Sequence, residues 1–330
     1  ISDKLTIISP LYTSKNVGAH KAQIRSKENL INKIEKLLRK ELKIKPVKKP
    51  VGKIKFTAKI DERKYSKIVD TAKKYIQAGD IFQIVPSRRF VSDFNLPTIS
   101  FYRSLRSINP SPYLFYYKVK NFVIAGSSPE IMVRLKDNKV TLRPIAGTRK
   151  RGEGAVQDLQ LEKDLLEDKK EIAEHLMLLD LGRNDVSRVS KAGTLKVTEK
   201  MVVERYSHVM HIVSNVEGEL QKGKDAIDCL IAGFPAGTVS GAPKVRAMEI
   251  IDELEIEKRQ FYAGTIGYIS ANGEMDTAIM LRTALIKDKK IYIQAGGGVV
   301  YDSTPEYEFE ETQNKAKALI KAAENAINYL

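Results

Sequence analysis

The sequence has 330 residues, of which 56 are Lys or Arg and 41 are Asp or Glu, so its formal net charge is +15. Residues 1–60 contain 16 basic and 4 acidic residues, which leaves +3 for residues 61–330. This basic segment lacks interleaved aromatic residues and any recognised nucleic-acid motif, which favours a solvated lysine-rich surface over a nucleic-acid-binding one. The single cysteine, Cys229, excludes an intramolecular disulfide framework and a cysteine-based metal cage.

The hydrophobic content and the length of the sequence indicate a chain that can build a large hydrophobic core, because 42% of its 330 residues are hydrophobic. No apolar run is long enough to cross a bilayer and no signal-peptide pattern is present, so we expect a cytoplasmic protein. The sequence opens at Ile1 within a segment typical of a strand and turn, and we expect further sequence upstream. We predict two parts: residues 1–60, a basic remnant of an N-terminal region plus linker, and residues 61–330, the folded body.

The predicted elements begin with an amphipathic helix over residues 26–42, whose apolar positions repeat at helical spacing. Residues 43–55 carry two prolines and a run of lysines, which predicts a linker or exposed connection. A second helix is predicted from Asp61, as N-cap, to Gly79, as the C-terminal stop.

Beyond Asp80 the pattern becomes rich in strands. Asp137 and Asn138 lie between two apolar segments and predict a hairpin turn. Hairpins with inserted helices indicate an α+β fold with antiparallel sheets. Strands are predicted at residues 81–85, 113–117, 122–125, 131–135, 140–143, 209–214, 263–269, 277–286 and 291–295, and longer helices at 160–181, 242–254 and 305–330.

Two of the predicted helices carry pairs of glutamates three residues apart, which places each pair on one helix face. Glu171 and Glu174 form one pair, Glu308 and Glu311 form the other, and Lys315 follows one turn later. Two such helices facing each other would offer hard oxygen ligands for Mg²⁺. The alternative is a solvated face, which is the usual role of glutamates on lysine-rich helices.

Three glycine-bearing loops, at residues 144–149, 233–244 and 294–298, adjoin predicted strands. None matches a nucleotide-binding glycine motif. Their exposed N–H groups either hold a carboxylate or phosphate, or the glycines form sharp turns and bulges.

His211 lies in an apolar strand whose alternation places Met210 and Ile212 on the opposite face. It either binds an anion or carries a proton, or it is a satisfied core histidine. Cys229 has apolar neighbours, which predicts a buried thiol and argues against covalent thiol catalysis.

Together, these segments resemble anthranilate synthase component I, within the larger family of chorismate-utilising enzymes. The similarity runs from about residue 60 to the C-terminus and rests on several ordered motifs. It implies a layered α/β/β/α fold built on large antiparallel sheets with helices outside. The motifs are Asn109-Pro-Ser-Pro-Tyr-Leu-Phe, Gly126-Ser-Ser-Pro-Glu130, Pro144-Ile-Ala-Gly-Thr-Arg, the run from Glu174 to Asp185, Gly237-Thr-Val-Ser-Gly-Ala-Pro-Lys244, and the triple-glycine loop followed by Glu308 and Glu311.

The resemblance implies a lyase of tryptophan biosynthesis. It would aminate chorismate at C2 with loss of the C4 hydroxyl and then eliminate pyruvate to leave anthranilate. By the same resemblance, Glu174 and Glu311 would be the principal Mg²⁺ ligands, with Glu171 and Glu308 contributing directly or through water. Glu130 would be the general acid that protonates the departing hydroxyl, a role that requires a raised pKa.

Substrate-binding residues are also implied by the resemblance. Arg282 can bind one chorismate carboxylate bidentately. His211 would lie near the reacting ring, acting either electrostatically or as a base in the pyruvate elimination. The implied binding set is Gly147, Thr148, His211, Thr238, Tyr262, Arg282, Gly296, Gly297, Gly298 and Lys315.

Ala146 discriminates within the family. The related aminodeoxychorismate synthases typically place a nucleophilic lysine there, and the isochorismate-forming branch uses a lysine elsewhere to activate water. Alanine can neither attack nor abstract a proton, which favours ammonia as the nucleophile and anthranilate synthase over aminodeoxychorismate synthase, the alternative. The sequence has no glutamine amidotransferase segment, so a separate glutaminase subunit is the expected source of ammonia.

The family's tryptophan feedback site combines an upstream Leu-Glu-Ser element with the Asn-Pro-Ser-Pro-Tyr motif. Only the second half is present in this sequence, at Pro112, Tyr113 and Leu114. The chain as given therefore leaves open whether the feedback site is intact.

Overall fold

The computed structural model describes residues 5–11, 17–41, 54–206 and 209–330. The chain divides into two compact units, Ile1–Lys48 and Lys49–Leu330. The first contains helix α1 (Val17–Leu38), which begins upstream of the predicted helix over residues 26–42. Residue 42 and most of the predicted linker lie outside the described residues. No helix in the described ranges is long and apolar enough to cross a membrane.

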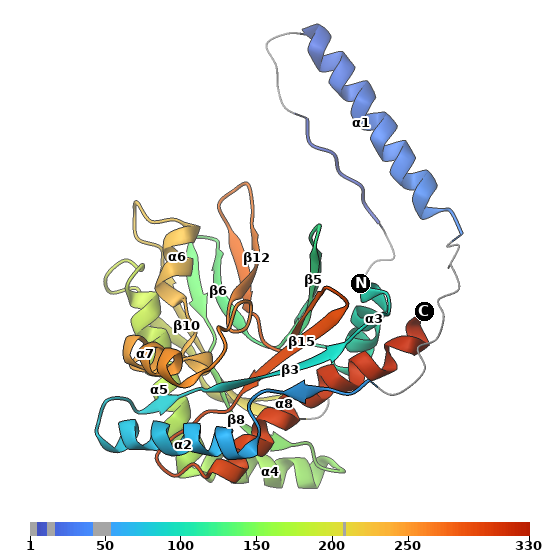
Figure 1. Ribbon diagram of the computed structural model, residues 1–330. Coiled ribbons are helices and arrows are strands. Elements are labelled where there is room, and N and C mark those ends of the chain that lie inside the picture. Colours follow the sequence, from blue (N-terminus) through green and yellow to red (C-terminus); the bar gives the residue numbers. More distant parts are fainter. Residues whose placement is uncertain (1–4, 12–16, 42–53, 207–208) are drawn as a thin grey trace. The chain divides into compact units, whose positions relative to one another are not determined.

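The second unit contains two large sheets, some of whose strands are labelled in Figure 1. The strands are β1 (Thr57–Ala58), β2 (Gln83–Ile84), β3 (Ser87–Asp93), β4 (Tyr113–Lys118), β5 (Phe122–Ser128), β6 (Ile131–Lys136), β7 (Lys139–Leu142), β8 (Ile145–Lys150), β9 (Lys196–Arg205), β10 (Val209–Glu219), β11 (Gly241–Ala242), β12 (Thr265–Ile269), β13 (Met275–Ile279), β14 (Thr283–Lys287) and β15 (Lys290–Gly296). One sheet has the order β1-β3-β15-β14-β5-β4. The other has the order β12-β13-β6-β7-β10-β8, with β9 also paired to β10, and β11 pairs with β2.

Helices cover these sheets. They are α2 (Glu62–Gln77), α3 (Thr98–Ile108), α4 (Ala155–Glu167), α5 (Lys169–Ser187), α6 (Ala226–Gly233), α7 (Lys244–Leu254) and α8 (Pro305–Asn325), with short 3₁₀ helices η1 (Gly237–Val239) and η2 (Ala326–Tyr329). Helices α3 and α8 pack on the first sheet, whereas α4, α5 and α6 pack on the second (Figure 1). Strand pairing between the named strands is antiparallel throughout, so the predicted α+β class with antiparallel sheets and outer helices is confirmed.

Burial of apolar side chains explains why the helices adopt these positions. Phe101 of α3 and Leu319 of α8 are buried in one core cluster together with Ile293 of β15. Leu179 of α5 packs with Met132 of β6 in a second cluster. Each cluster removes one helix stripe and one sheet face from water, which is the main stabilising contribution to such layers.

Local signals in the sequence correspond closely to the structure at several places. Asp61 caps α2, because its carboxylate accepts a hydrogen bond from the Lys64 N–H at 2.9 Å. Gly79 follows the end of that helix with a φ of 85°. Asp137 and Asn138 join β6 to β7 with φ values of 48° and 59°, the backbone that a two-residue hairpin of this kind requires.

Other predicted boundaries are wrong. The single helix expected over residues 160–181 is two helices, because Asp168 has extended backbone between them and its side chain caps α5. The strand expected over residues 277–286 is likewise two strands, β13 and β14, separated at Arg282, whose φ is 47°. The predicted elements do not include α3, α6, β3, β8 and β9, nor the short elements β1, β11 and η1.

Candidate active site

A cavity of about 500 Å³ opens where the two large sheets and helices α5 and α8 meet. Most of the predicted site residues line it. They are Glu130, Gly147, Thr148, Glu171, Glu174, His211, Thr238, Tyr262, Arg282, Gly296, Gly298, Glu308, Glu311 and Lys315, together with Pro112. Gly297, Tyr113 and Leu114 do not line it; Tyr113 instead donates a hydrogen bond from its hydroxyl to Asp276 Oδ1 at 3.1 Å.

Glu130 lies in the short connection between β5 and β6, and it is buried. The Thr238 hydroxyl donates a hydrogen bond to Glu130 Oε1 at 2.8 Å. Burial raises the pKa of Glu130 to about 7, against the opposing effects of Thr238, Lys315 and Arg282. At neutral pH a large share of this carboxyl is therefore protonated, as a general acid needs to be.

Arg282 and Lys315 are the two cavity-lining cations that act on the pKa of Glu130. Arg282 is held at its position by the turn between β13 and β14, and its guanidinium has no ion-pair partner among the described residues. Lys315 donates a hydrogen bond to the Gly296 carbonyl at 3.0 Å and pairs with Glu311 Oε1 at 3.3 Å. Arg282 is therefore the group with free capacity for a carboxylate of a ligand.

His211 faces the cavity from β10. Its Nδ1 lies 3.0 Å from the Gly147 carbonyl oxygen and 3.0 Å from Thr148 Oγ1. Because the carbonyl can only accept, Nδ1 carries the proton of the neutral ring and Nε2 keeps its lone pair. Burial lowers the pKa of His211, which favours this neutral form. Met210 and Ile212 are buried on the opposite face, as predicted.

The four predicted glutamates come from two helices that meet at one end of the cavity. Glu171 and Glu174 project from α5, and Glu308 and Glu311 from α8. Burial is the main cause of the raised pKa of Glu174, and Glu171 and Glu311 add to it by repulsion. Burial and Glu311 raise the pKa of Glu308 to about 7. The four glutamates therefore bring together more negative charge than the neighbouring cations neutralise.

This combination of groups corresponds to a known family. Residues 7–321 match the family model described as chorismate binding enzyme. The chain belongs to the chorismate-binding enzyme family. The match begins well upstream of residue 60, where the resemblance in the motifs was expected to begin.

Individual relatives sharpen this membership. The chain is 55% identical over 330 residues to anthranilate synthase component 1 from Cereibacter sphaeroides, covering 99% of this chain and 65% of that protein. It is 50% identical to anthranilate synthase component 1 from Acinetobacter calcoaceticus, covering 100% of this chain and 66% of that protein. The chain thus spans slightly less than two thirds of the length of these curated relatives.

Solved structures agree with the fold. Anthranilate synthase component I from Streptococcus pneumoniae TIGR4 superimposes with a TM-score of 0.84 at 43% identity, covering 95% of this chain and 68% of that chain. The menaquinone-specific isochorismate synthase from Escherichia coli superimposes with a TM-score of 0.76 at 26% identity, covering 88% of this chain and 67% of that chain. The predicted resemblance and the predicted layered fold are therefore confirmed.

For a chorismate-binding enzyme, the fit of the glutamates to Mg²⁺ can be tested at Gly297. A methyl carbon on Gly297 would lie 2.7 Å from Glu308 Oε2 and 2.9 Å from Glu311 Oε2, so glycine keeps open the space beside these oxygens. Glu308 Oε2 is buried and has no hydrogen-bond partner in the described part of the chain. There, no three acidic, His or Cys side chains already converge as a complete metal site. Mg²⁺ needs only one or two carboxylates plus water and substrate oxygens, so the donors suit it.

Gln83 of β2 also lines the cavity and is not among the predicted site residues. Its side-chain nitrogen donates a hydrogen bond to Glu174 Oε1 at 2.9 Å, and its own Oε1 is buried without a described partner. A polar residue inside the apolar run of residues 81–85 was the available signal. The other unpredicted polar lining residues include Asn109, Lys170, Tyr206, Gln294 and Tyr307.

Proposed function

We propose that residues 61–330 form the catalytic domain of the large, aminating subunit of an anthranilate synthase. The reaction combines chorismate and ammonia and gives anthranilate, pyruvate and water. The observation that carries this proposal is the buried Glu130 carboxyl, with a pKa of about 7, in one cavity with Arg282, Lys315 and two glutamate-bearing helices. The names and the 50–55% identity of the relatives support it.

Chorismate carries two carboxylates, and the cavity offers a separate site for each. Arg282 has free donors for one of them. The other would lie by the Gly296–Gly298 loop, near the four glutamates. Glu174 and Glu311 would be the principal Mg²⁺ ligands, with Glu171 and Glu308 contributing directly or through water. When bound, Mg²⁺ would neutralise the ring carboxylate and orient the ring.

Glu130 is the proposed general acid of the amination. Its proton goes to the C4 hydroxyl, the C4–O bond breaks, and water leaves as ammonia bonds to C2. The new ammonium nitrogen then gives up one proton to solvent, which balances the proton that Glu130 has donated. The Thr238 hydroxyl, which donates to Glu130 Oε1, stabilises the carboxylate that remains. The acid and the ammonia therefore act at opposite ends of one rearranging π-system.

His211 is the proposed base of the elimination. Its Nδ1 is bound to the Gly147 carbonyl, which leaves Nε2 free to take the proton from C2. As the C2–H bond breaks, the C3–O bond also breaks with its electron pair on oxygen, and the released enolate takes up a proton at its CH2 carbon to become pyruvate. The ring is then aromatic, which drives the step forward.

Ala146 lines the cavity. By resemblance, it occupies the position at which aminodeoxychorismate synthases carry a nucleophilic lysine. A methyl side chain cannot form a covalent adduct with the ring, so ammonia itself is the nucleophile in our proposal. Aminodeoxychorismate synthase component I is the second candidate, because it shares the remaining cavity groups by resemblance.

We further propose that ammonia comes from a separate glutamine amidotransferase subunit, giving a hetero-oligomer in the cytoplasm. The relatives are named component 1, which implies a second component. We propose no membrane or nucleic-acid partner. The basic segment 1–60 acts instead as a solvated surface in this proposal.

Product analysis tests the assignment. Purified protein incubated with chorismate, Mg²⁺ and an ammonium salt should release fluorescent anthranilate and an equal amount of pyruvate. Omitting Mg²⁺, with a chelator present, should abolish both. A stable aminated chorismate that retains its pyruvyl group would contradict the proposal and establish the second candidate.

A further inference from the structure

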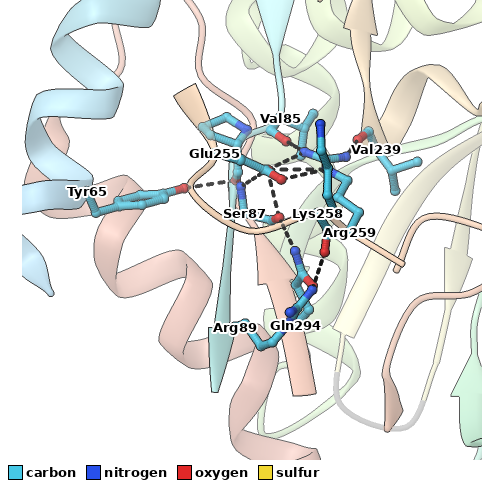
Figure 2. Close-up of polar contacts among 10 residues, drawn as sticks. Tyr65, Val85, Ser87, Arg89, Val239, Glu255, Lys258, Arg259 and Gln294 are labelled. Carbon is cyan, nitrogen blue, oxygen red and sulfur yellow. Dashed lines mark hydrogen bonds and ion pairs between the residues drawn. The ribbon is translucent and has the colours of Figure 1, made fainter. Parts of the chain in front are cut away.

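A buried polar network that the proposed chemistry does not use lies beside the cavity, and only its outer members Val85, Val239 and Gln294 reach the lining (Figure 2). Its centre is an ion pair between Glu255, directly after α7, and Arg259, in the loop that follows. The Arg259 guanidinium lies 2.6 Å from Glu255 Oε1, and the two side chains are 17% and 5% exposed. Neither residue lines the cavity, so neither can touch a substrate there.

Arg259 connects two segments that do line the cavity. One of its terminal nitrogens donates to the Val239 carbonyl at 2.6 Å, and the other donates to the Val85 carbonyl at 2.5 Å. Val239 directly follows Thr238 in η1, and Val85 lies between β2 and β3. A single planar group therefore joins the turn that carries Thr238 to the start of a sheet strand (Figure 2).

Glu255 anchors the other side of this pair. Its Oε1 accepts hydrogen bonds from the backbone N–H and the hydroxyl of Ser87, each at 2.8 Å. Gln294 donates to the Ser87 hydroxyl at 2.7 Å, and Arg89 donates to Gln294 Oε1 at 3.2 Å. The orientation of Arg259 is thus fixed by β3 and β15 and not by solvent.

We propose that Arg259, held by Glu255, is a positioning residue for Thr238. It fixes the turn from which the Thr238 hydroxyl reaches Glu130. The inference deepens the proposed function, because it rests on the proposed role of Glu130. The inference concerns the hydrogen bond from the Thr238 hydroxyl to Glu130 Oε1, however, and the effect of that bond on the ionisation of Glu130 can be measured without turnover.

A threonine side chain has a short reach, so the position of its hydroxyl follows the position of the backbone. The Thr238 hydroxyl is one rotatable bond from the backbone, so a displacement of η1 moves it directly. Hydrogen bonds weaken steeply as their distance and angle depart from the optimum. Arg259 constrains the backbone at the very next residue.

Lysine cannot substitute for arginine in this arrangement. The guanidinium offers five donors in a rigid plane, which lets it bind two carbonyls and a carboxylate at once. The ammonium of Arg259→Lys keeps the charge near Glu255 but cannot hold both carbonyls in that geometry. The variant therefore tests positioning while it preserves the ion pair.

The experiment follows ionisation of Glu130 by infrared difference titration, with its carboxyl band assigned as the one missing in Glu130→Gln. Thr238→Val should move the midpoint to higher pH, because the carboxylate loses a hydrogen bond. Arg259→Lys should move it by the same amount, and the double variant should show no additional shift. The control is Arg246→Lys, on α7 and paired with Asp80 and Glu249, which should leave the midpoint unchanged.

An unchanged Glu130 midpoint in folded Arg259→Lys, or fully additive shifts in the double variant, would overturn the inference. Should Arg259→Lys not fold, Glu255→Gln takes its place, since it keeps an acceptor for Ser87 but removes the charge that holds Arg259. Failure of both variants to fold would also contradict a role confined to positioning. If the variants show the expected shifts of the Glu130 midpoint but the wild-type protein makes no anthranilate, the proposed function is refuted and the inference about Arg259 still stands.

Discussion

Glu130 shows how a single carboxyl is kept available as an acid in a cavity that is also lined by cations. Arg282 and Lys315 both favour its ionised form, as does the Thr238 hydroxyl. Burial has the larger effect and raises the pKa of Glu130 to about 7. The carboxyl is thus poised near neutral pH, where a general acid has both the proton and the tendency to release it.

This pKa predicts a specific pH dependence of kcat/KM. The acid form is required, so activity should be retained below pH 7 and fall as pH rises through about 7. The slope well above that pH should approach roughly tenfold per pH unit. Anthranilate fluorescence should be followed with free ammonia held constant, because ammonium itself ionises in the alkaline range. A flat profile between pH 7 and pH 9 would remove Glu130 from the acid role.

Replacement of the same carboxyl gives a second prediction at this scale. Glu130→Gln keeps the shape and can still accept the hydrogen bond from Thr238, but it has no acidic proton. We expect kcat to fall by about 10²–10⁴-fold while the chorismate Kd changes little. Steady-state kinetics and calorimetric binding measure the two quantities. Near-normal turnover would be incompatible with the assignment.

At the scale of elements, α8 carries two of the glutamates and is held firmly along its first turns. Thr304 caps it, and Pro305 begins it. Arg88 of β3 lies with its guanidinium 4.0 Å from the ring centre of Phe309 and donates to Thr312 Oγ1 at 3.2 Å. These contacts fix the orientation of the helix face that presents Glu308 and Glu311.

Neighbouring residues on α8 provide a matched pair of variants. Glu311→Gln removes one negative charge from the cavity and should lower activity by 100-fold or more, on the order of the loss expected for a metal ligand or its close support. Glu310→Gln makes the same chemical change on the exposed face and should leave activity within about twofold. Initial rates at several Mg²⁺ concentrations give the comparison. Equal rates for both variants would sink the metal assignment.

Gly297 provides a test of the metal site that does not depend on turnover. In wild type, Mg²⁺ at 100 times its Kd should increase the free energy of unfolding by about 2.7 kcal/mol. Gly297→Ala places a methyl group beside Glu308 Oε2 and Glu311 Oε2, so most of this increase should disappear. Gly154→Ala, where a methyl group meets open space, is the control. Thermal unfolding with and without MgCl₂ measures the effect, and an undiminished increase in Gly297→Ala would contradict the site.

At the scale of the whole molecule, strands with apolar residues on both sides of turn residues could be predicted from the sequence. Strand β3, whose buried residues are largely polar, could not. β6 and β7 followed from their apolar residues around Asp137 and Asn138. β3 begins Ser87-Arg88-Arg89, a sequence that suggests an exposed loop. Its polar groups are buried because distant partners satisfy them, such as Gln294 for Arg89 and the Ile60 carbonyl for Arg88. Partners so far away in sequence leave no local pattern.

The same distinction applies to the cavity. Motifs placed Glu130 and His211 in it, because the resemblance carried each residue over individually. The location of Gln83 beside Glu174 depends on two elements that are 91 residues apart. The carbonyl contacts of Arg259 likewise depend on tertiary packing and not on spacing. Chemistry-bearing residues were therefore easier to predict than the residues that hold them.

The contribution of both α5 and α8 to the cavity lining also determines when the site can exist during synthesis. Gln83 and Glu130 leave the ribosome before Glu308, Glu311 and Lys315, which belong to α8. A nascent chain therefore exposes the part of the cavity lining that includes Glu171 and Glu174 until α8 has been synthesised. We expect the emerging intermediate to be the stage most dependent on chaperones, since large chains with long-range pairing fold slowly and expose apolar surface meanwhile.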